Sequence, residues 1–139
     1  MVCSRVFLDS DVLLDMLLNR DPFYHYVQAL LAESVQQNFK ICTSTLALAN
    51  INYILIKKIG KANAREKIKY LNNSLEILAF EKESIALAVD SKFSDLEDAF
   101  QHFIGKRFNC DVIITKNTKD YKQSEIPVYT PEQFLRQIL

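Results

Sequence analysis

Short runs of apolar, mostly β-branched residues alternate along this chain with longer segments whose apolar residues recur every three or four positions. The short runs are continuous rather than interrupted by polar residues, which is typical of strands buried on both faces of a parallel sheet. The longer segments have the period of amphipathic helices. The expected strands are 5–8, 40–43, 75–80, 111–115 and 128–129.

Several of the helical segments also carry residue types that begin or end helices. Ser44 or Thr43 precedes a long helical pattern as an N-cap, and Gly60 follows it as a C-cap. Strands that alternate with helices predict a three-layer α/β/α sandwich around a mostly parallel sheet of about five strands. The expected helices are 11–18, 23–38, 46–59, 61–73, 82–90, 94–107 and a last one opened by Thr130 and Pro131.

The composition fits one domain that spans residues 1–139. The 17 basic residues balance the 17 acidic ones, so a basic surface for nucleic acid has to be local. Acids interrupt the apolar run near the N-terminus, and we therefore expect neither a signal peptide nor a membrane span. Cys3, Cys42 and Cys110 lack a metal-binding spacing and border apolar runs, which predicts buried free thiols and a cytoplasmic location.

Acidic residues follow the first expected strand directly. In parallel α/β sheets the chemistry lies beyond the carboxyl ends of the strands, where residues distant in sequence meet. Asp9 stands at this place, but helix capping explains it as well as metal binding does, because Asp is favoured at N-caps. Asp11 and Asp15 fall inside the next helix and are interpreted as dipole or surface charges, although Asp15 interrupts an apolar stretch.

A second acidic cluster runs from Ser94 to Asp98. Ser94 and Glu97 have the spacing of a capping box, which predicts a structural role for Glu97. Asp95 and Asp98 then share one face of the first helical turn, and two like charges so placed repel one another unless a cation lies between them. This pair therefore favours a cation-binding site.

The segment after the fourth expected strand adds polar groups to the same edge, although an ordinary turn also accounts for Asn and Asp there. Mg²⁺ and Mn²⁺ prefer several oxygen ligands, which such an edge supplies. Two isolated His and three scattered Cys do not form a zinc site, and the sequence has no glycine-rich phosphate loop. The candidate metal ligands are Asp9, Asp95, Asp98, Asn117 and Asp120.

Basic residues also gather around the expected site. Lys116 and Lys119 flank it and are placed to hold a phosphodiester backbone, together with the hydroxyl groups of Ser10 and Thr115. A solvated basic face is the ordinary explanation for such a run. RNA binding at these four residues is the functional alternative.

The order of these blocks resembles the PIN-domain family over nearly the whole chain, and the tail is similar to that of a bacterial branch of the family. No single block is specific, but their order and spacing together are. The likeness lies in VFLDSDVLLD with NRDPFY after it, TSTLALANINYIL, FSDLEDAF, CDVIITKNTKDY and the tail IPVYTPEQFL.

This resemblance implies a metal-dependent ribonuclease. Many members are toxins of toxin–antitoxin pairs, typically dimeric and silenced by a small partner protein. By motif match, Asp9 takes the place of the family's first acid, Asp98 that of the third, and Asn117 or Asp120 that of the fourth. The second acid falls at or next to Asn50, where this sequence has an amide and lacks a full negative charge.

Two hypotheses follow from Asn50. In the first, Asp95 supplies the missing charge, and the domain is an active endoribonuclease that uses Mg²⁺ or Mn²⁺. Asp9 and Asp98 are then direct metal ligands, and Asp95 is a ligand or a water-orienting base. In the second, the metal binds weakly, and the domain binds RNA or a protein partner without cleavage.

A third alternative belongs to a different class of enzyme. The segments DSDV and VIIT match the first two motifs of haloacid-dehalogenase-type phosphatases, with Asp9 as the nucleophile. Those enzymes place an acidic pair after the second motif, whereas Asp95 and Asp98 precede VIIT in this chain. The order of the motifs therefore counts against this alternative.

Overall fold

The structure, a computed structural model, describes residues 3–139. Its centre is a five-stranded sheet with the order β3-β2-β1-β4-β5, in which every neighbouring pair is parallel. Every predicted strand is present, and the predicted fold class is confirmed. The strands are β1 (Arg5–Leu8), β2 (Lys40–Ser44), β3 (Glu76–Leu78), β4 (Val112–Ile114) and β5 (Val128–Tyr129).

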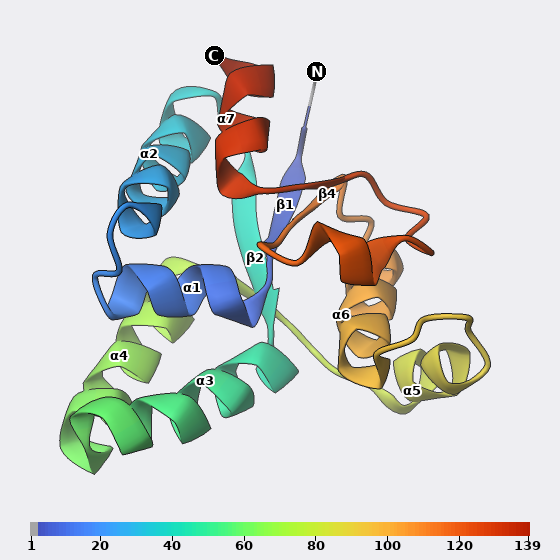
Figure 1. Ribbon diagram of the computed structural model, residues 1–139, viewed down its shortest axis with the longest axis horizontal. Helices are drawn as coiled ribbons and strands as arrows, with labels where there is room; N and C mark the ends of the chain where they lie inside the picture. The colour runs from blue at the N-terminus through green and yellow to red at the C-terminus, as the bar shows by residue number, and fades with distance from the viewer. Residues whose placement is uncertain (1–2) are drawn as a thin grey trace.

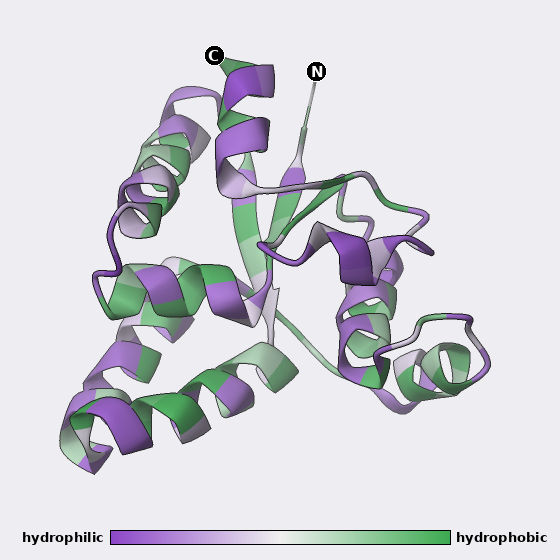
Figure 2. Cartoon of the chain, viewed as in Figure 1, coloured by the Kyte–Doolittle hydropathy of each residue, from purple (hydrophilic) through white to green (hydrophobic). Residues whose placement is uncertain are grey.

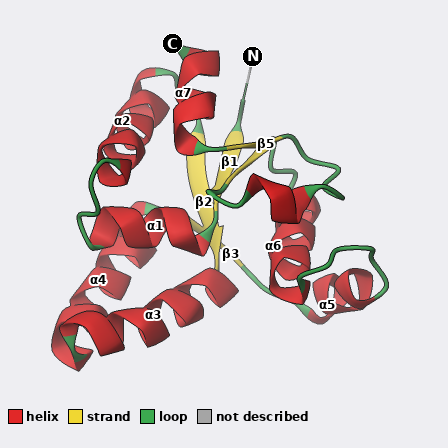
Figure 3. Cartoon of the chain, in the orientation of Figure 1, coloured by secondary structure: helices red, strands yellow, loops and turns green. Residues whose placement is uncertain are grey.

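Helices cover both faces of this sheet (Figures 1 and 3). One side carries α1 to α4 together with α7, and the other carries α5 and α6. The predicted three layers are therefore present. The helices are α1 (Ser10–Leu17), α2 (Phe23–Gln36), α3 (Thr45–Ile59), α4 (Lys61–Ser74), α5 (Lys82–Val89), α6 (Leu96–Arg107), the 3-10 helix η1 (Thr118–Tyr121) and α7 (Pro131–Ile138).

Alternate side chains of the central strands enter two separate cores. On β1, Val6 and Leu8 join the core beneath α1 to α4 and α7, whereas Phe7 joins the core beneath α6. All three side chains are fully buried, and the middle parts of β1 and β2 accordingly appear green, the colour of hydrophobic residues, in Figure 2. Burial on both faces is why the strand sequences are continuous apolar runs.

The helix boundaries follow the predicted caps in the middle of the chain. The Ser44 hydroxyl accepts a hydrogen bond from the Ala47 amide at 2.9 Å and caps α3. Gly60 ends α3 with φ 85°, a conformation that favours glycine, and it also opens α4. Cys42 and Cys110 are buried as predicted, but Cys3 is partly exposed. Among residues 3–139, no helix has the length and apolar character that crossing a bilayer requires.

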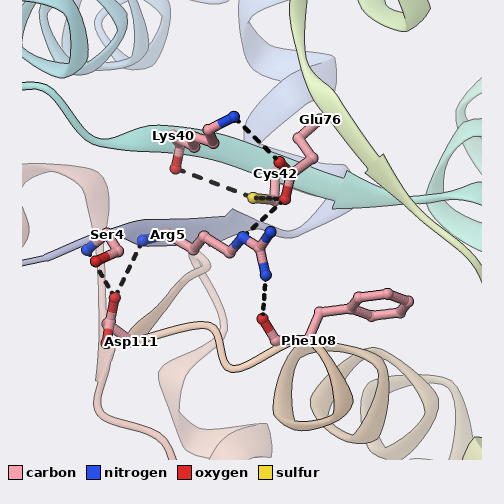
Figure 4. Close-up of polar contacts among 7 residues, drawn as sticks. All are labelled: Ser4, Arg5, Lys40, Cys42, Glu76, Phe108 and Asp111. Atoms are coloured by element: carbon pink, nitrogen blue, oxygen red, sulfur yellow. Dashed lines mark hydrogen bonds and ion pairs between the residues drawn. The ribbon is translucent and has the colours of Figure 1, made fainter.

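Opposite charges meet at the edge of the sheet where the strands begin (Figure 4). The Arg5 guanidinium lies 2.9 Å from the Glu76 carboxylate, and the Lys40 ammonium lies 3.7 Å from it. The Asp111 carboxylate accepts hydrogen bonds from the backbone amides of Ser4 at 2.8 Å and Arg5 at 3.0 Å. Ion pairs thus join β1, β2 and β3, and hydrogen bonds to a carboxylate join β1 to the residue before β4.

The opposite edge, where the strands end, contains the topological switch point. The chain leaves β1 toward β2 on one side, while β4 lies on the other side of β1. In open parallel sheets the crevice beyond such a reversal is the usual binding site. Asp9 follows β1 and Thr115 follows β4 at this place, and the Asp9 amide extends the strand pairing by donating to the Ile114 carbonyl at 2.9 Å.

Candidate active site

Asp9 is a buried acid that directly follows β1 at the switch point. Its carboxylate accepts hydrogen bonds from the Ser10 amide at 2.7 Å, the Thr115 hydroxyl at 3.0 Å and the Tyr121 hydroxyl at 3.1 Å. Asp9 is also the N-cap of α1. The capping interpretation is therefore confirmed, and the same side chain is fixed at the crevice by groups from three separate segments.

The electrostatic environment of Asp9 is unfavourable for a negative charge. Burial raises the pKa of Asp9, hydrogen bonds from Ser10, Thr115 and Tyr121 lower it, and the charge of Asp95 raises it further. The net direction is upward because the loss of solvation dominates. The three hydrogen bonds hold this carboxylate in place but offset only part of the cost of burying its charge.

Asp98, in the first turn of α6, belongs to the same electrostatic site. Partial burial and then the charges of Asp9 and Asp95 raise its pKa to about 7, and Asp120 and Glu97 contribute in the same direction. Four other acids thus influence one carboxyl group. The structure brings the second acidic cluster of the sequence to the end of β1, as the sequence predicted.

The capping box predicted for Ser94 and Glu97 is wrong. Asp95 is the N-cap of α6, and its carboxylate accepts a hydrogen bond from the Asp98 amide at 3.0 Å. Glu97 is therefore not a capping residue. Its carboxylate instead accepts a hydrogen bond from the Asn50 side-chain amide of α3 at 3.0 Å.

The hydrogen bond from Asn50 to Glu97 gives the amide at position 50 a role that the sequence did not show. Burial and the charges of Asp9 and Asp95 raise the pKa of Glu97, while the hydrogen bond from Asn50 lowers it. Glu97 therefore lies within the field of the acidic edge. An amide on α3 holds a carboxylate of α6 near the place where the family pattern has an acid on α3.

Asp11 and Asp15 are more closely tied to the site than the sequence suggested. The Asp11 carboxylate accepts a hydrogen bond from the Lys116 amide at 3.2 Å, and burial followed by the charge of Asp9 raises its pKa to about 7. The prediction of a surface or dipole role for Asp15 is wrong, because its side chain is 1% exposed and pairs with the Lys116 ammonium at 2.9 Å and with Arg20 at 3.4 Å.

The segment after β4 folds as the 3-10 helix η1, where the sequence predicted only a turn. Asn117 is exposed, and its side-chain amide lies 3.5 Å from the Asp11 carboxylate. Asp120 is exposed within η1 and contributes to the raised pKa of Asp98. Tyr121 closes η1 as a buried residue that donates to Asp9. The sequence reasoning missed Tyr121, although an aromatic residue within a polar turn is a signal for it.

A buried polar contact fixes the position of α6 against the sheet. The Ser44 hydroxyl, at the end of β2, donates to the Gln101 side-chain oxygen at 2.7 Å. Both residues are fully buried. Because α6 carries Asp98 one turn before Gln101, this contact helps to place Asp98 relative to Asp9. Gln101 was another positioning residue that the sequence reasoning missed.

The donor atoms at this edge are suited to a hard divalent cation. Among residues 3–139, no three Asp, Glu, His or Cys side chains converge tightly enough to form a ready-made metal centre. The charges of Asp9 and Asp95 nevertheless raise the pKa of both Glu97 and Asp98, so carboxylates of three segments of this edge lie close enough to repel one another. Their oxygens are the ligand type that Mg²⁺ and Mn²⁺ prefer. The residues therefore fit such an ion.

These features define a class of protein, namely a parallel α/β domain with an acidic site at its switch point. The sequence model of the PIN domain matches residues 5–119. The chain therefore belongs to the PIN-domain family. It is 31% identical to the protein named ribonuclease VapC1 of Aquifex aeolicus over 136 residues, which cover 94% of this chain and 93% of that protein.

Solved structures support the same fold. DNA-bound VapBC from Salmonella typhimurium matches with a TM-score of 0.72 and 12% identity, covering 92% of this chain and 98% of that chain. VapC20 from Mycobacterium tuberculosis, described as a sarcin–ricin loop cleaving toxin, matches with a TM-score of 0.63 and 12% identity, covering 78% of this chain and 86% of that chain. Membership in the PIN-domain family sets aside the phosphatase alternative for Asp9.

Proposed function

We propose that this protein is a metal-dependent endoribonuclease of the PIN type and the toxin of a toxin–antitoxin pair. The observation that carries the proposal is the group of carboxylates around Asp9 and Asp98 at the switch point of the sheet, where the charges of Asp9 and Asp95 raise the pKa of both Glu97 and Asp98. The relative named ribonuclease VapC1 and the similarity to VapC and VapBC structures support the same conclusion.

Asp9 and Asp98 supply the principal ligand oxygens in this proposal. A bound Mg²⁺ or Mn²⁺ would lower the pKa of a water nucleophile and offset charge on the phosphoryl oxygens. The chain's own contribution is to hold the ligands in position: Thr115 and Tyr121 orient the Asp9 carboxylate, and Asp95 fixes the first turn of α6 beneath Asp98. Asp120 and Asn117 add oxygen atoms at the exposed side.

Glu97 takes over the charge that Asn50 lacks. The sequence pattern suggested Asp95 for this role. The Asp95 carboxylate caps α6, however, and it is Glu97 that contacts Asn50. The hydrogen bond of 3.0 Å from Asn50 directs the Glu97 carboxylate toward α3. An amide at position 50 is therefore compatible with cleavage, because it positions an acid from the neighbouring helix.

The residues proposed to contact RNA divide into two groups. Lys119 is exposed on η1 and, among residues 3–139, has no ion pair such as the one that Lys116 makes with Asp15, so it is placed to meet a phosphate. Ser10 lies beside Asp9 at the start of α1. Thr115 and Lys116 act mainly by holding Asp9, Asp11 and Asp15 in place.

The proposal is tested by cleavage of a labelled single-stranded RNA in the presence of Mn²⁺. We expect cleavage by the wild-type protein, its loss in EDTA, and its loss in Asp9→Asn with the melting temperature preserved. Cleavage by Asp9→Asn at the wild-type rate would contradict the assignment of Asp9.

The alternative is a domain that binds RNA or a partner without cutting. Calorimetric titration with Mn²⁺ separates the two, because a domain without a functional site should bind no metal at millimolar concentration. We expect saturable Mn²⁺ binding by the wild type and its loss in Asp9→Asn.

An antitoxin partner and a homodimer are parts of the same proposal. Co-expression with the product of an adjacent short open reading frame tests the antitoxin.

A further inference from the structure

A small aromatic pocket adjoins the acidic edge. Its volume is about 320 Å³, at the lower end of the range of about 300–1,000 Å³ typical of small-ligand sites. The first turn of α2, the segment after β4 and the start of α7 form its walls, so segments far apart in the sequence build it. The lining residues are Phe23, Tyr26, Lys116, Thr130, Pro131 and Glu132.

Lys116 connects this pocket directly to the proposed catalytic centre. Its ammonium lies 4.4 Å from the centre of the Phe23 ring and 2.9 Å from the buried Asp15 carboxylate. Its backbone amide donates to Asp11, and the preceding residue, Thr115, donates to Asp9. Lys116 therefore lines the pocket and contacts the acids of α1 at the same time, which places the pocket beside the acidic edge.

Phe23 is the unusual residue of the pocket. It is 41% exposed although it is a large hydrophobic side chain. Aromatic rings that lie beside a cationic side chain along a nucleic-acid path stack with nucleobases, and such stacking contributes about 1–3 kcal/mol per base. Thr130 and Glu132 also line the pocket and bring a hydroxyl and a carboxylate, groups that can contact the polar edge of a base. The hydroxyl accepts a hydrogen bond from the Gln133 amide and keeps its own proton to donate, and one carboxylate oxygen pairs with Arg136, which leaves the other as an acceptor.

We propose that this pocket binds one unpaired nucleobase of the RNA strand, stacked on Phe23, next to the phosphodiester that the acidic edge cleaves. The proposal rests on the proposed ribonuclease function, because that function places a single RNA strand at the neighbouring edge. The pocket selects single-stranded RNA, since a base paired in a helix cannot turn outward to stack.

The first test measures binding of a fluorescein-labelled, random-sequence single-stranded RNA octamer by anisotropy with Mn²⁺ present. The measurements are made in the Asp98→Asn background so that the RNA stays intact. We expect Phe23→Ala to weaken binding about 10-fold and Phe23→Trp to retain it. Tyr53→Ala is the matched control, because Tyr53 is 63% exposed and carries Lys57 at 4.2 Å from its ring, but lies in the third turn of α3.

The second test removes the base rather than the side chain. The ligands are octamers of one fixed sequence, each with the base removed at a single position. With the Asp98→Asn protein that keeps Phe23, we expect one position where base removal weakens binding about 10-fold. The same position should have no effect in Phe23→Ala. A flat series, or equal losses in Phe23→Ala and Tyr53→Ala, would overturn the nucleobase pocket.

Cleavage by otherwise unaltered protein keeps this proposal separate from the proposed function. If the wild type fails to cut RNA but the Phe23 dependence holds, the nuclease assignment fails and the pocket stands as a base-binding site. If the wild type cuts RNA but Phe23→Ala has unchanged binding and KM, the nuclease stands and the pocket proposal fails. Thermal melting of Phe23→Ala, which changes a partly exposed side chain, verifies that the fold is retained.

Discussion

At the amino-terminal edge of the sheet, acids meet cations or backbone amides (Figure 4), whereas the carboxyl edge concentrates carboxylates. At the first, Glu76 lies between Arg5 and Lys40, and Asp111 accepts two amide hydrogen bonds. At the second, the charge of Asp95 raises the pKa of Asp9, and the charges of Asp9 and Asp95 raise the pKa of Asp98. Both edges belong to the same five strands, so the strands themselves do not account for the difference.

The contrast separates residues that stabilise the fold from residues that prepare a site. Paired charges at the ends of strands lower the free energy of the folded state modestly and tie neighbouring strands together. Buried acids that repel one another raise it, and proteins retain such arrangements mainly at functional sites. The acidic edge therefore indicates function more strongly than any single motif of the sequence does.

The largest expected difference between the edges is in cleavage. Asp98→Asn should reduce Mn²⁺-dependent RNA cleavage on the order of 100- to 1,000-fold, because a charged ligand becomes a neutral one. Asp111→Asn, the same chemical change at the opposite edge, should leave the cleavage rate unchanged. The measurement is the initial rate of cleavage at saturating Mn²⁺. Equal rates in the two variants would remove the functional distinction between the edges.

A smaller effect is expected from Glu97→Gln, which keeps the side-chain shape but removes the charge beside Asn50. Cleavage should fall by about 10–100-fold. Adding Asn50→Glu to this variant places a carboxylate on α3 instead, and it should restore part of the rate. No recovery in the double variant, together with an unchanged rate in Glu97→Gln alone, would show that Glu97 does not replace the missing acid.

The acidic edge should also make metal-free stability depend on pH. The pKa of Asp98 is about 7 in the folded protein and 3.8 in the unfolded chain, so between these values the folded state retains a proton that the unfolded state releases. The contribution of Asp98 to the free energy of unfolding is therefore complete below the pKa of the unfolded chain. It is lost as the pH rises through the pKa of the folded protein.

Urea unfolding in EDTA at about pH 5 and about pH 7 measures this dependence. The free energy of unfolding should fall with rising pH in the wild type and fall less in Asp98→Asn. Addition of Mn²⁺ near neutral pH should raise the melting temperature of the wild type, because a ligand of the folded state stabilises it. A wild type and an Asp98→Asn variant with identical pH dependence would contradict the raised pKa.

The smallest expected effect is on stability at the amino-terminal edge. Asp111→Asn should lower the free energy of unfolding by about 1 kcal/mol, because Asn accepts the amide hydrogen bonds of Ser4 and Arg5 less strongly than a carboxylate. Urea unfolding at neutral pH measures it. If Asp111→Asn lost cleavage but kept its stability, Asp111 would belong with the residues of the site and not with those that stabilise the fold.

Local patterns in the sequence were sufficient for most of the fold. Apolar runs such as the one in β4 are specific because burial on both faces removes the alternation that other strands show. Ser44 and Gly60 were predicted as caps because capping depends on residues only a few positions apart. Asp9 and Asp98 were predicted as metal ligands from similarly local signals, because one follows a strand and the other lies at the start of a helix.

Contacts between distant segments were decided only by the tertiary structure. Nothing local shows that Glu97 contacts Asn50, that Asp15 is buried against Lys116, or that Tyr121 donates to Asp9. The three pairs lie 47, 101 and 112 positions apart, beyond the reach of helical or strand periodicity. The sequence by itself thus determined the strands and most of the helices, and it predicted Asp9 and Asp98 as the principal acids of the site. Packing of α3, α6 and η1 around β1 decided which acid accompanies Asp9, because side-chain partners depend on the path of the whole chain.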